Sequence, residues 1–148
     1  GPSTVRPAIQ RQALPETPFN QLVQMTQIKE NLHSSKHTIL DARAKERYQG
    51  DIEPLDPVAG HIPGALNRPY KLNLTHTGHF KTQEVLRDEF LALGISPHEL
   101  IHQCGSGVTA CHNLFAMEYA GLKGSQLYAG SWSEWCQYPD NPVALGPG

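Results

Sequence analysis

The chain has 148 residues, of which 39% are hydrophobic and 18% are charged. This length and composition predict one globular domain with a single core, and they exclude a disordered chain. The net charge of -2 offers no basic surface for nucleic acid or for an anionic membrane. No apolar run approaches the roughly 20 residues that a membrane helix needs, and no secretory signal opens the chain. We therefore expect a cytoplasmic protein that binds neither nucleic acid nor membrane.

The chain carries three cysteines, which are Cys104, Cys111 and Cys136. An odd number without a CxxC pair argues against a disulfide framework and fits a reducing compartment. A structural zinc site would need about four ligands in closely spaced pairs, and the histidines do not supply that pattern. We therefore expect no metal and no other cofactor.

The two ends of the chain differ in composition from its middle. Residues 1–18 contain four prolines and no periodic apolar pattern, which predicts a linker or an extended arm. Residues 19–145 are expected to form the domain, and residues 146–148 a tail. The prolines and glycines from Pro139 onward predict a loose end.

The first half of the domain predicts short elements of alternating type. A helix is expected from a cap at Thr26 to about Ser34, followed by a buried strand within 37–42. A short helix over 44–49 and a loop rich in proline and glycine over 51–64 come next. A further short strand is expected at 65–67.

The second half continues the alternation. Thr82 is expected to cap a helix to about Leu93, with residues 84–86 and 90–91 facing inward and Gly94 ending it. A strand over 100–103 precedes a largely apolar helix over 107–119, which should pack on more than one side. A strand at 127–128 is followed by a short helix capped by Ser131.

Strands that alternate with helices at crossover spacing predict an α/β fold, with a parallel sheet and helices on both faces. In such sheets ligands bind beyond the carboxyl ends of the strands. Cys104 occupies this position, directly after one predicted strand and directly before a helix.

The run after Cys104 reads Gly105, Ser106, Gly107, Val108, Thr109. Two glycines at alternate positions let the backbone curl and turn several N–H groups inward, which makes an anion-binding nest. The positive end of the following helix acts in the same direction. Both effects favour thiolate over thiol at Cys104 and would equally stabilise a persulfide anion. We expect Cys111 to lie in the core of its helix and Cys136 to have no role in the chemistry.

Other cysteine chemistries fit less well. A phosphatase loop of the Cys-x5-Arg type needs an arginine to clamp phosphate, and Ala110 stands at that place. A thiol protease or acyl transferase needs a basic partner for the cysteine. His102 is the nearest histidine in sequence, and a strand-end histidine is more often a structural donor.

Four ordered motifs resemble the rhodanese family of sulfurtransferases, in particular its mercaptopyruvate sulfurtransferase branch. The active-site loop is similar to residues 104–110. The remaining likenesses are Asp41-Ala42-Arg43 with Arg47-Tyr48, the run Gly60-His61-Ile62-Pro63-Gly64-Ala65, and residues 128–135. The resemblance covers about residues 20–145.

This resemblance implies a rhodanese-like domain with a five-stranded parallel sheet and helices on both faces. It implies that Cys104 takes a sulfane sulfur from 3-mercaptopyruvate or thiosulfate, rests as a persulfide, and passes the sulfur to cyanide, a thiol or a thioredoxin-like acceptor. Ser106 matches a serine proposed to help activate the donor. The substrate-binding positions are Arg47, Arg43, Gly105, Gly107, Val108 and Thr109, of which Arg43 either binds or braces.

The donor is left open between two compounds. Family members that favour thiosulfate usually carry cations inside the loop, whereas Gly105 and Ser106 are neutral and favour a carboxylate donor such as mercaptopyruvate. Leu55, however, stands where mercaptopyruvate enzymes have a second binding arginine. Thiosulfate or another persulfide donor therefore stays open.

Two further questions stay open from the sequence. A non-catalytic persulfide carrier, or a regulatory sulfur-binding module, is the alternative to an enzyme, and a domain used only for assembly is a third reading. The resemblance also implies a second, N-terminal rhodanese-like domain, because the family's mercaptopyruvate enzymes have two in tandem. We expect the chain to be the catalytic half of such a protein.

Overall fold

The computed structural model of the chain describes residues 21–106 and 108–147. Its centre is a sheet of five parallel strands in the order β1-β5-β4-β2-β3. The strands are β1 (Leu22–Val23), β2 (Thr38–Asp41), β3 (Leu66–Asn67), β4 (Leu100–Gln103) and β5 (Gln126–Tyr128). The expected linker at residues 1–18 lies outside the described residues. No helix in the described part is long and apolar enough to cross a membrane.

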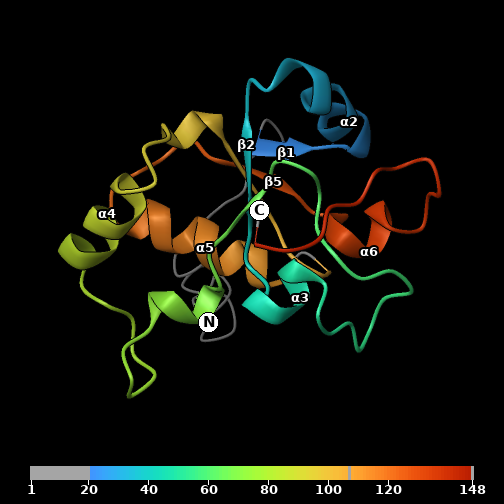
Figure 1. Ribbon diagram of the computed structural model, residues 1–148. Helices are drawn as coiled ribbons and strands as arrows, with labels where there is room; N and C mark the ends of the chain where they lie inside the picture. Colours follow the sequence, from blue (N-terminus) through green and yellow to red (C-terminus); the bar gives the residue numbers. More distant parts are fainter. Residues whose placement is uncertain (1–20, 107, 148) are drawn as a thin grey trace, which may run out of the picture.

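Helices cover both faces of the sheet, as the alternation of elements predicted (Figure 1). On one face lie α4 (Gln83–Leu91) and α5 (Val108–Tyr119), and on the other lie α2 (Met25–Ser34) and α6 (Ser131–Trp135). The short helix α3 (Lys45–Gln49) follows β2, and two 3-10 turns, η2 (Tyr70–Asn73) and η3 (Pro97–Glu99), complete the elements.

Each face of the sheet has its own apolar core. Alternation along the strands sends Leu40 and Leu100 toward α4 and α5, and Ile39 and Ile101 toward α2 and α6. Trp132 and Trp135 are fully buried on the second face. Each such side chain contributes about 1.5–3 kcal/mol by leaving water, which explains how strands of two to four residues hold together.

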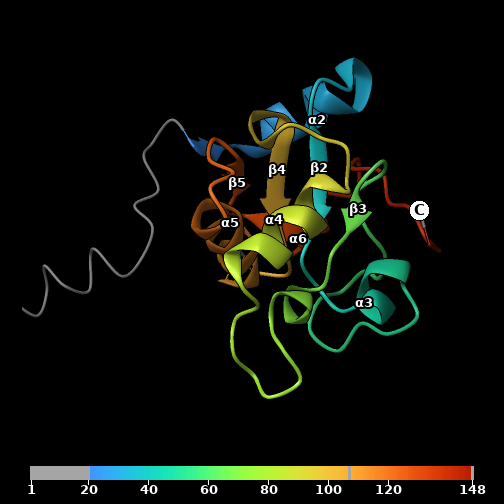
Figure 2. The ribbon, with the colours of Figure 1, turned by 90° about the vertical axis from the view of Figure 1, so that its left-hand side faces the viewer.

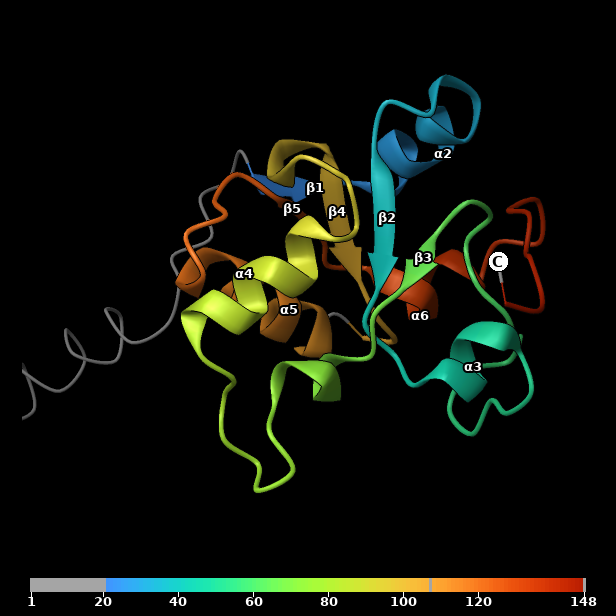
Figure 3. The ribbon, with the colours of Figure 1, turned by 60° about the vertical axis from the view of Figure 1, so that its left-hand side comes forward.

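The strands bring their carboxyl ends to one edge of the sheet. Figure 2 shows β2 and β4 side by side with their arrowheads pointing the same way. Figure 3 shows α3 and the loop after it at this same end. The chain therefore places residues from four segments, those after β2, β3, β4 and β5, around one edge.

The structure corrects several sequence-based expectations on the helices. The cap of α2 is Gln24 and not Thr26, which lies inside the helix. The side chain of Gln27 accepts the Gln24 N–H at 2.7 Å and so fixes the start of the helix at this point. Thr82 is confirmed as the cap of α4, accepting the Val85 N–H at 3.3 Å. Val85 itself is 43% exposed, so the inward stripe is narrower than predicted. The same is true of Leu91, which is 48% exposed, while Leu86 and Phe90 are buried.

The carboxyl-terminal segment is better held than its composition suggested. His61 and Ala144 exchange two backbone hydrogen bonds of 2.9 Å, and the Gly146 N–H donates to the Gln49 carbonyl at 2.8 Å. The Trp135 indole N–H also donates to the Pro142 carbonyl. The expectation of a loose end does not hold for residues 142–145, because the backbone groups of Pro142 and Ala144 are hydrogen-bonded to other parts of the chain.

Candidate active site

Cys104 lies directly after β4, between the ends of β2 and β5, and is only 1% exposed. Its backbone N–H donates to the Ser131 hydroxyl at 3.0 Å, and its carbonyl accepts the Trp132 N–H at 2.9 Å. The Gly105 carbonyl accepts the Ser133 N–H at 2.8 Å. The first turn of α6 thus satisfies its otherwise unpaired N–H groups with carbonyls of the cysteine loop.

Ser131 has a different role from the helix cap that was predicted for it. The residue preceding α6 is Gly130, and Ser131 itself is the first residue of the helix, with a left-handed φ of 57°. Its hydroxyl accepts from Cys104 and donates to the Tyr128 carbonyl at 2.9 Å. A fully buried side chain therefore links the ends of β4 and β5. The expectation of Ser131 as a helix cap is wrong, because its hydroxyl is used between strands.

Beyond Cys104 the loop is described in part. Gly105 is buried, Ser106 is exposed and Thr109 is half-buried at the start of α5. Gly107 and the side chain of Val108 lie outside the described residues. The predicted nest of N–H groups and the roles of these loop residues therefore stay predictions.

Arg47 reaches the loop from α3. A Cβ built on Gly105 would lie 3.2 Å from its Nη2 and 3.3 Å from its Nη1, so the guanidinium covers the backbone of Gly105. Nη2 donates to Glu53 at 3.1 Å and to Asp56 at 3.3 Å. The buried Nε of Arg47 has no hydrogen-bond partner among the described residues.

Arg43 lies deeper in the protein and is 2% exposed. Its Nη2 pairs with Asp41 at 2.7 Å and donates to the Gly60 carbonyl at 2.7 Å. Its guanidinium carbon lies 5.0 Å from the ring centroid of Trp132. These contacts join the end of β2 to α6 and to the loop before β3, which is a bracing geometry.

The loop after α3 supplies two carboxylates. Glu53 accepts the backbone N–H groups of Leu55 and Asp56 at 3.0 and 2.9 Å. Burial alone would raise the pKa of Glu53, but these two bonds and the one from Arg47 outweigh it, so its pKa lies below its ordinary value. Asp56 accepts the Ser133 hydroxyl at 2.9 Å. Leu55 between them is 78% exposed.

His102 is a structural member of the core, as the sequence indicated. It is fully buried, and its Nε2 lies 3.1 Å from the Ser125 hydroxyl. Burial lowers its pKa to about 3, so the ring is neutral at physiological pH. The two amide atoms of Gln103, the next residue of β4, are buried and have no hydrogen-bond partner among the described residues.

Neither of the other two cysteines forms a disulfide bond with a described residue. Cys111 is exposed on α5, so its predicted core position is wrong. The prediction rested on the apolar residues around Cys111 in the sequence, whereas α5 presents this position to solvent. Cys136 is 8% exposed and packs with the core that contains Trp132 and Trp135.

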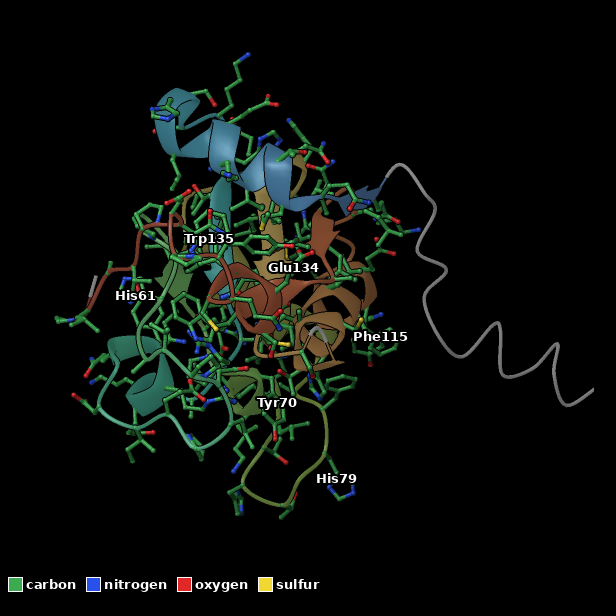
Figure 4. The ribbon with its side chains drawn as sticks, turned by 90° about the vertical axis from the view of Figure 1, so that its right-hand side faces the viewer. His61, Tyr70, His79, Phe115, Glu134 and Trp135 are labelled. Carbon is green, nitrogen blue, oxygen red and sulfur yellow. The ribbon has the colours of Figure 1, made fainter. Side chains whose placement is uncertain are left out.

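A row of aromatic side chains that the sequence did not predict begins beside the cysteine at Tyr70 and continues along α5. Tyr70 of η2 packs against the cluster of Ala42, Cys104 and Ala110. Figure 4 shows Tyr70 and Phe115 on the same side of the molecule, below α6. Ring contacts connect Tyr70, His112, Phe80, Phe115 and Tyr119 into one row. His112, Phe115 and Tyr119 stand at helical spacing on α5, but no sequence period connects them to Tyr70 in η2 or to Phe80 in a loop.

Comparison with known proteins identifies relatives over most of the chain. The family described as "Rhodanese-like domain" matches residues 24–138. A probable 3-mercaptopyruvate sulfurtransferase from Pseudomonas aeruginosa is 54% identical over 110 residues, which cover 73% of this chain and 39% of that protein. A thiosulfate sulfurtransferase from Gallus gallus is 38% identical over 110 residues, which cover 74% of this chain and 38% of that protein.

A solved structure of similar fold is the anaerobic ergothioneine biosynthesis enzyme from Chlorobium limicola in complex with trimethyl histidine. It has a TM-score of 0.76 and 25% identity, over 85% of this chain and 32% of that one. The chain therefore spans less than half the length of each of these relatives.

Proposed function

Since the chain belongs to the rhodanese-like domain family, we propose that it is a sulfurtransferase that carries a sulfane sulfur as a persulfide on Cys104. The donor is 3-mercaptopyruvate in the first place and thiosulfate in the second, and the acceptor is cyanide or a thiol, including that of a thioredoxin-like protein. Relatives named for both donors support this proposal. The cytoplasm, in which free thiols persist, is the proposed location.

The observation that carries the proposal is the position of Cys104 at the carboxyl edge of the sheet, with the Arg47 guanidinium over the adjoining Gly105. The cysteine supplies the nucleophile, and the arginine supplies a cation for an anionic donor within reach of it. Arg47 is the substrate-binding arginine in this proposal. Arg43 braces the site, because its guanidinium is already bound to Asp41 and Gly60.

The reaction has two displacements. The Cys104 thiolate attacks the thiol sulfur of mercaptopyruvate or the outer sulfur of thiosulfate. In mercaptopyruvate the carbon–sulfur bond breaks, and in thiosulfate the sulfur–sulfur bond breaks. The bonding electrons leave with pyruvate enolate, which takes up a proton, or with sulfite. An acceptor nucleophile then attacks the outer sulfur of the persulfide, and the thiolate of Cys104 leaves. Ser106 assists donor activation, while Gly105, Gly107, Val108 and Thr109 form the cradle around the anion.

Replacement of Cys104 with serine tests the proposal. The unaltered chain should gain the mass of one sulfur atom on Cys104 after treatment with either donor, and should then release thiocyanate with cyanide. Cys104→Ser should do neither, whereas Cys111→Ser should do both. Full activity in Cys104→Ser would refute the mechanism. Persulfide formation without turnover would instead identify the alternative, a carrier that hands sulfur to a partner protein.

We also propose that a second rhodanese-like domain precedes this one in the natural protein, because the relatives are more than twice as long as the matched region. The intact mass of the protein from its source tests this point. A natural chain of 148 residues would refute it.

A further inference from the structure

The loop after α3 surrounds the proposed donor-binding arginine with negative charge. We propose that Glu53 and Asp56 set the charge class of the donor, favouring a monoanion such as mercaptopyruvate over a dianion such as thiosulfate. This inference rests on the proposed function and concerns its specificity. It depends on three observations. These are the contacts of Arg47, the contacts that Glu53 and Asp56 make with groups other than Arg47, and the net negative charge of the cluster.

Among the described residues, the hydrogen bonds of the Arg47 guanidinium are confined to Nη2. Its Nη2 donates to both Glu53 and Asp56, at 3.1 and 3.3 Å, while its buried Nε has no partner among the described residues. A donor carboxylate that pairs with this guanidinium by charge therefore need not displace both acidic side chains, whose bonds are confined to Nη2. The two acids then stay in place and act on the donor through their charge.

Each carboxylate has contacts that hold it independently of Arg47. Glu53 accepts two backbone N–H groups of its own loop, from Leu55 and Asp56, and also faces Arg43 at 3.5 Å. Asp56 accepts the Ser133 hydroxyl from α6. The loop is further attached by the Trp132 indole N–H, which donates to the Val58 carbonyl at 2.8 Å. The acids are consequently fixed features of the site and not passing surface contacts.

The charges of this cluster do not balance. Three carboxylates, of Asp41, Glu53 and Asp56, face the two guanidinium groups of Arg43 and Arg47. The side chains of Glu53 and Asp56 are only 5% and 10% exposed, so solvent screens them weakly. The donor-binding Arg47 thus lies in surroundings with one excess negative charge. The repulsion between this charge and a dianion is twice its repulsion of a monoanion.

The size of this selection follows from the charge. Even at the dielectric of water, one charge about 4 Å from the donor changes its capture about fivefold per unit of donor charge, and this smallest value is used below. Neutralising one acid should therefore speed sulfur uptake from mercaptopyruvate about fivefold, and from thiosulfate about 25-fold.

The experiment measures single-turnover persulfide formation on Cys104 by mass spectrometry, with thiosulfate and 3-mercaptopyruvate separately. Glu53→Gln and Asp56→Asn keep an oxygen acceptor for Leu55 and Ser133 but remove the charge. Each should raise the ratio of the thiosulfate to the mercaptopyruvate rate constant about fivefold. Glu46→Gln, which removes an exposed charge on α3 next to Arg47, should leave the ratio within about twofold.

The outcomes separate the inference from the function on which it rests. Loss of positioning alone would slow both donors together, so an unchanged ratio in both variants, with an active unaltered chain, overturns the inference only. An equal shift in Glu46→Gln would also overturn it, since the effect would then be one of overall charge. No persulfide from either donor in the unaltered chain would overturn the proposed function together with the inference.

Discussion

Replacing Ser131 with alanine would remove one hydroxyl that connects two strands at the proposed active site. That hydroxyl accepts the Cys104 N–H at 3.0 Å and donates to the Tyr128 carbonyl at 2.9 Å, in a residue with no exposed surface. Two buried backbone groups would lose their partner, at about 1–3 kcal/mol for each. We expect Ser131→Ala to lower the free energy of unfolding by about 2–6 kcal/mol.

A glycine at the same position separates the hydrogen bonds from the backbone conformation. Ser131 has a φ of 57°, which costs a residue with a Cβ about 1–2 kcal/mol and glycine nearly nothing. Ser131→Gly should therefore be about 1 kcal/mol more stable than Ser131→Ala, although both lack the hydroxyl.

Urea unfolding at pH 7 measures these differences, with Ser96→Ala as the control. Ser96 is exposed, and its side chain makes no capping bond to η3, so its replacement should change stability by less than about 0.5 kcal/mol. Equal stabilities for the unaltered chain and Ser131→Ala would refute the reasoning. A glycine variant less stable than the alanine variant would refute the backbone part of it.

Three more substitutions have expected outcomes. Gly105→Ala places a Cβ 3.2 Å from Nη2 of Arg47, so the guanidinium must shift and single-turnover sulfur uptake should fall several-fold while urea stability changes little. Gly60→Ala places a Cβ at a φ of +122°, 2.6 Å from the Ala144 carbonyl oxygen, and calorimetry should show a loss of more than about 2 kcal/mol. His102 is neutral when folded, with a pKa of about 3 against an ordinary 6.5, so the unfolded chain binds its proton first and stability should fall as pH drops from 6.5 toward 3. Urea unfolding at pH 7 and 4.5 should show a smaller loss in His102→Gln, and an equal loss in both proteins would contradict this assignment.

The elements that the sequence predicted well are those whose signals are local. The limits of β4 coincide with the predicted strand at 100–103, and Thr82 caps α4 through a bond within its own turn. The sequence missed β1, because two residues carry no pattern and are a strand only through pairing with β5. The exposure of Cys111 likewise depends on how α5 is rotated against its neighbours, which composition does not fix.

The candidate site divides in the same way. Cys104, Arg47 and Arg43 were predicted from their motifs, and the structure brings Arg47 to the backbone of Gly105, next to Cys104. The acids on Arg47 could not be found by motif or spacing, because Glu53 and Asp56 lie in a loop without a regular period. Their contacts with Arg47 form because the loop folds back onto α3. Trp132, far along the chain, holds this loop through the bond from its indole N–H to the Val58 carbonyl.

The bonds from α6 to the cysteine loop have a consequence for the loop's dipoles. In a planar trans peptide the C=O and the following N–H point in opposite directions. Because the Cys104 and Gly105 carbonyls point toward the N–H groups of Trp132 and Ser133, the N–H groups of Gly105 and Ser106 must point away from α6. The polarity of the loop is therefore set by a helix that comes later in the chain. A cysteine loop transplanted to another sheet without that helix would lose the anchors that turn its peptide planes.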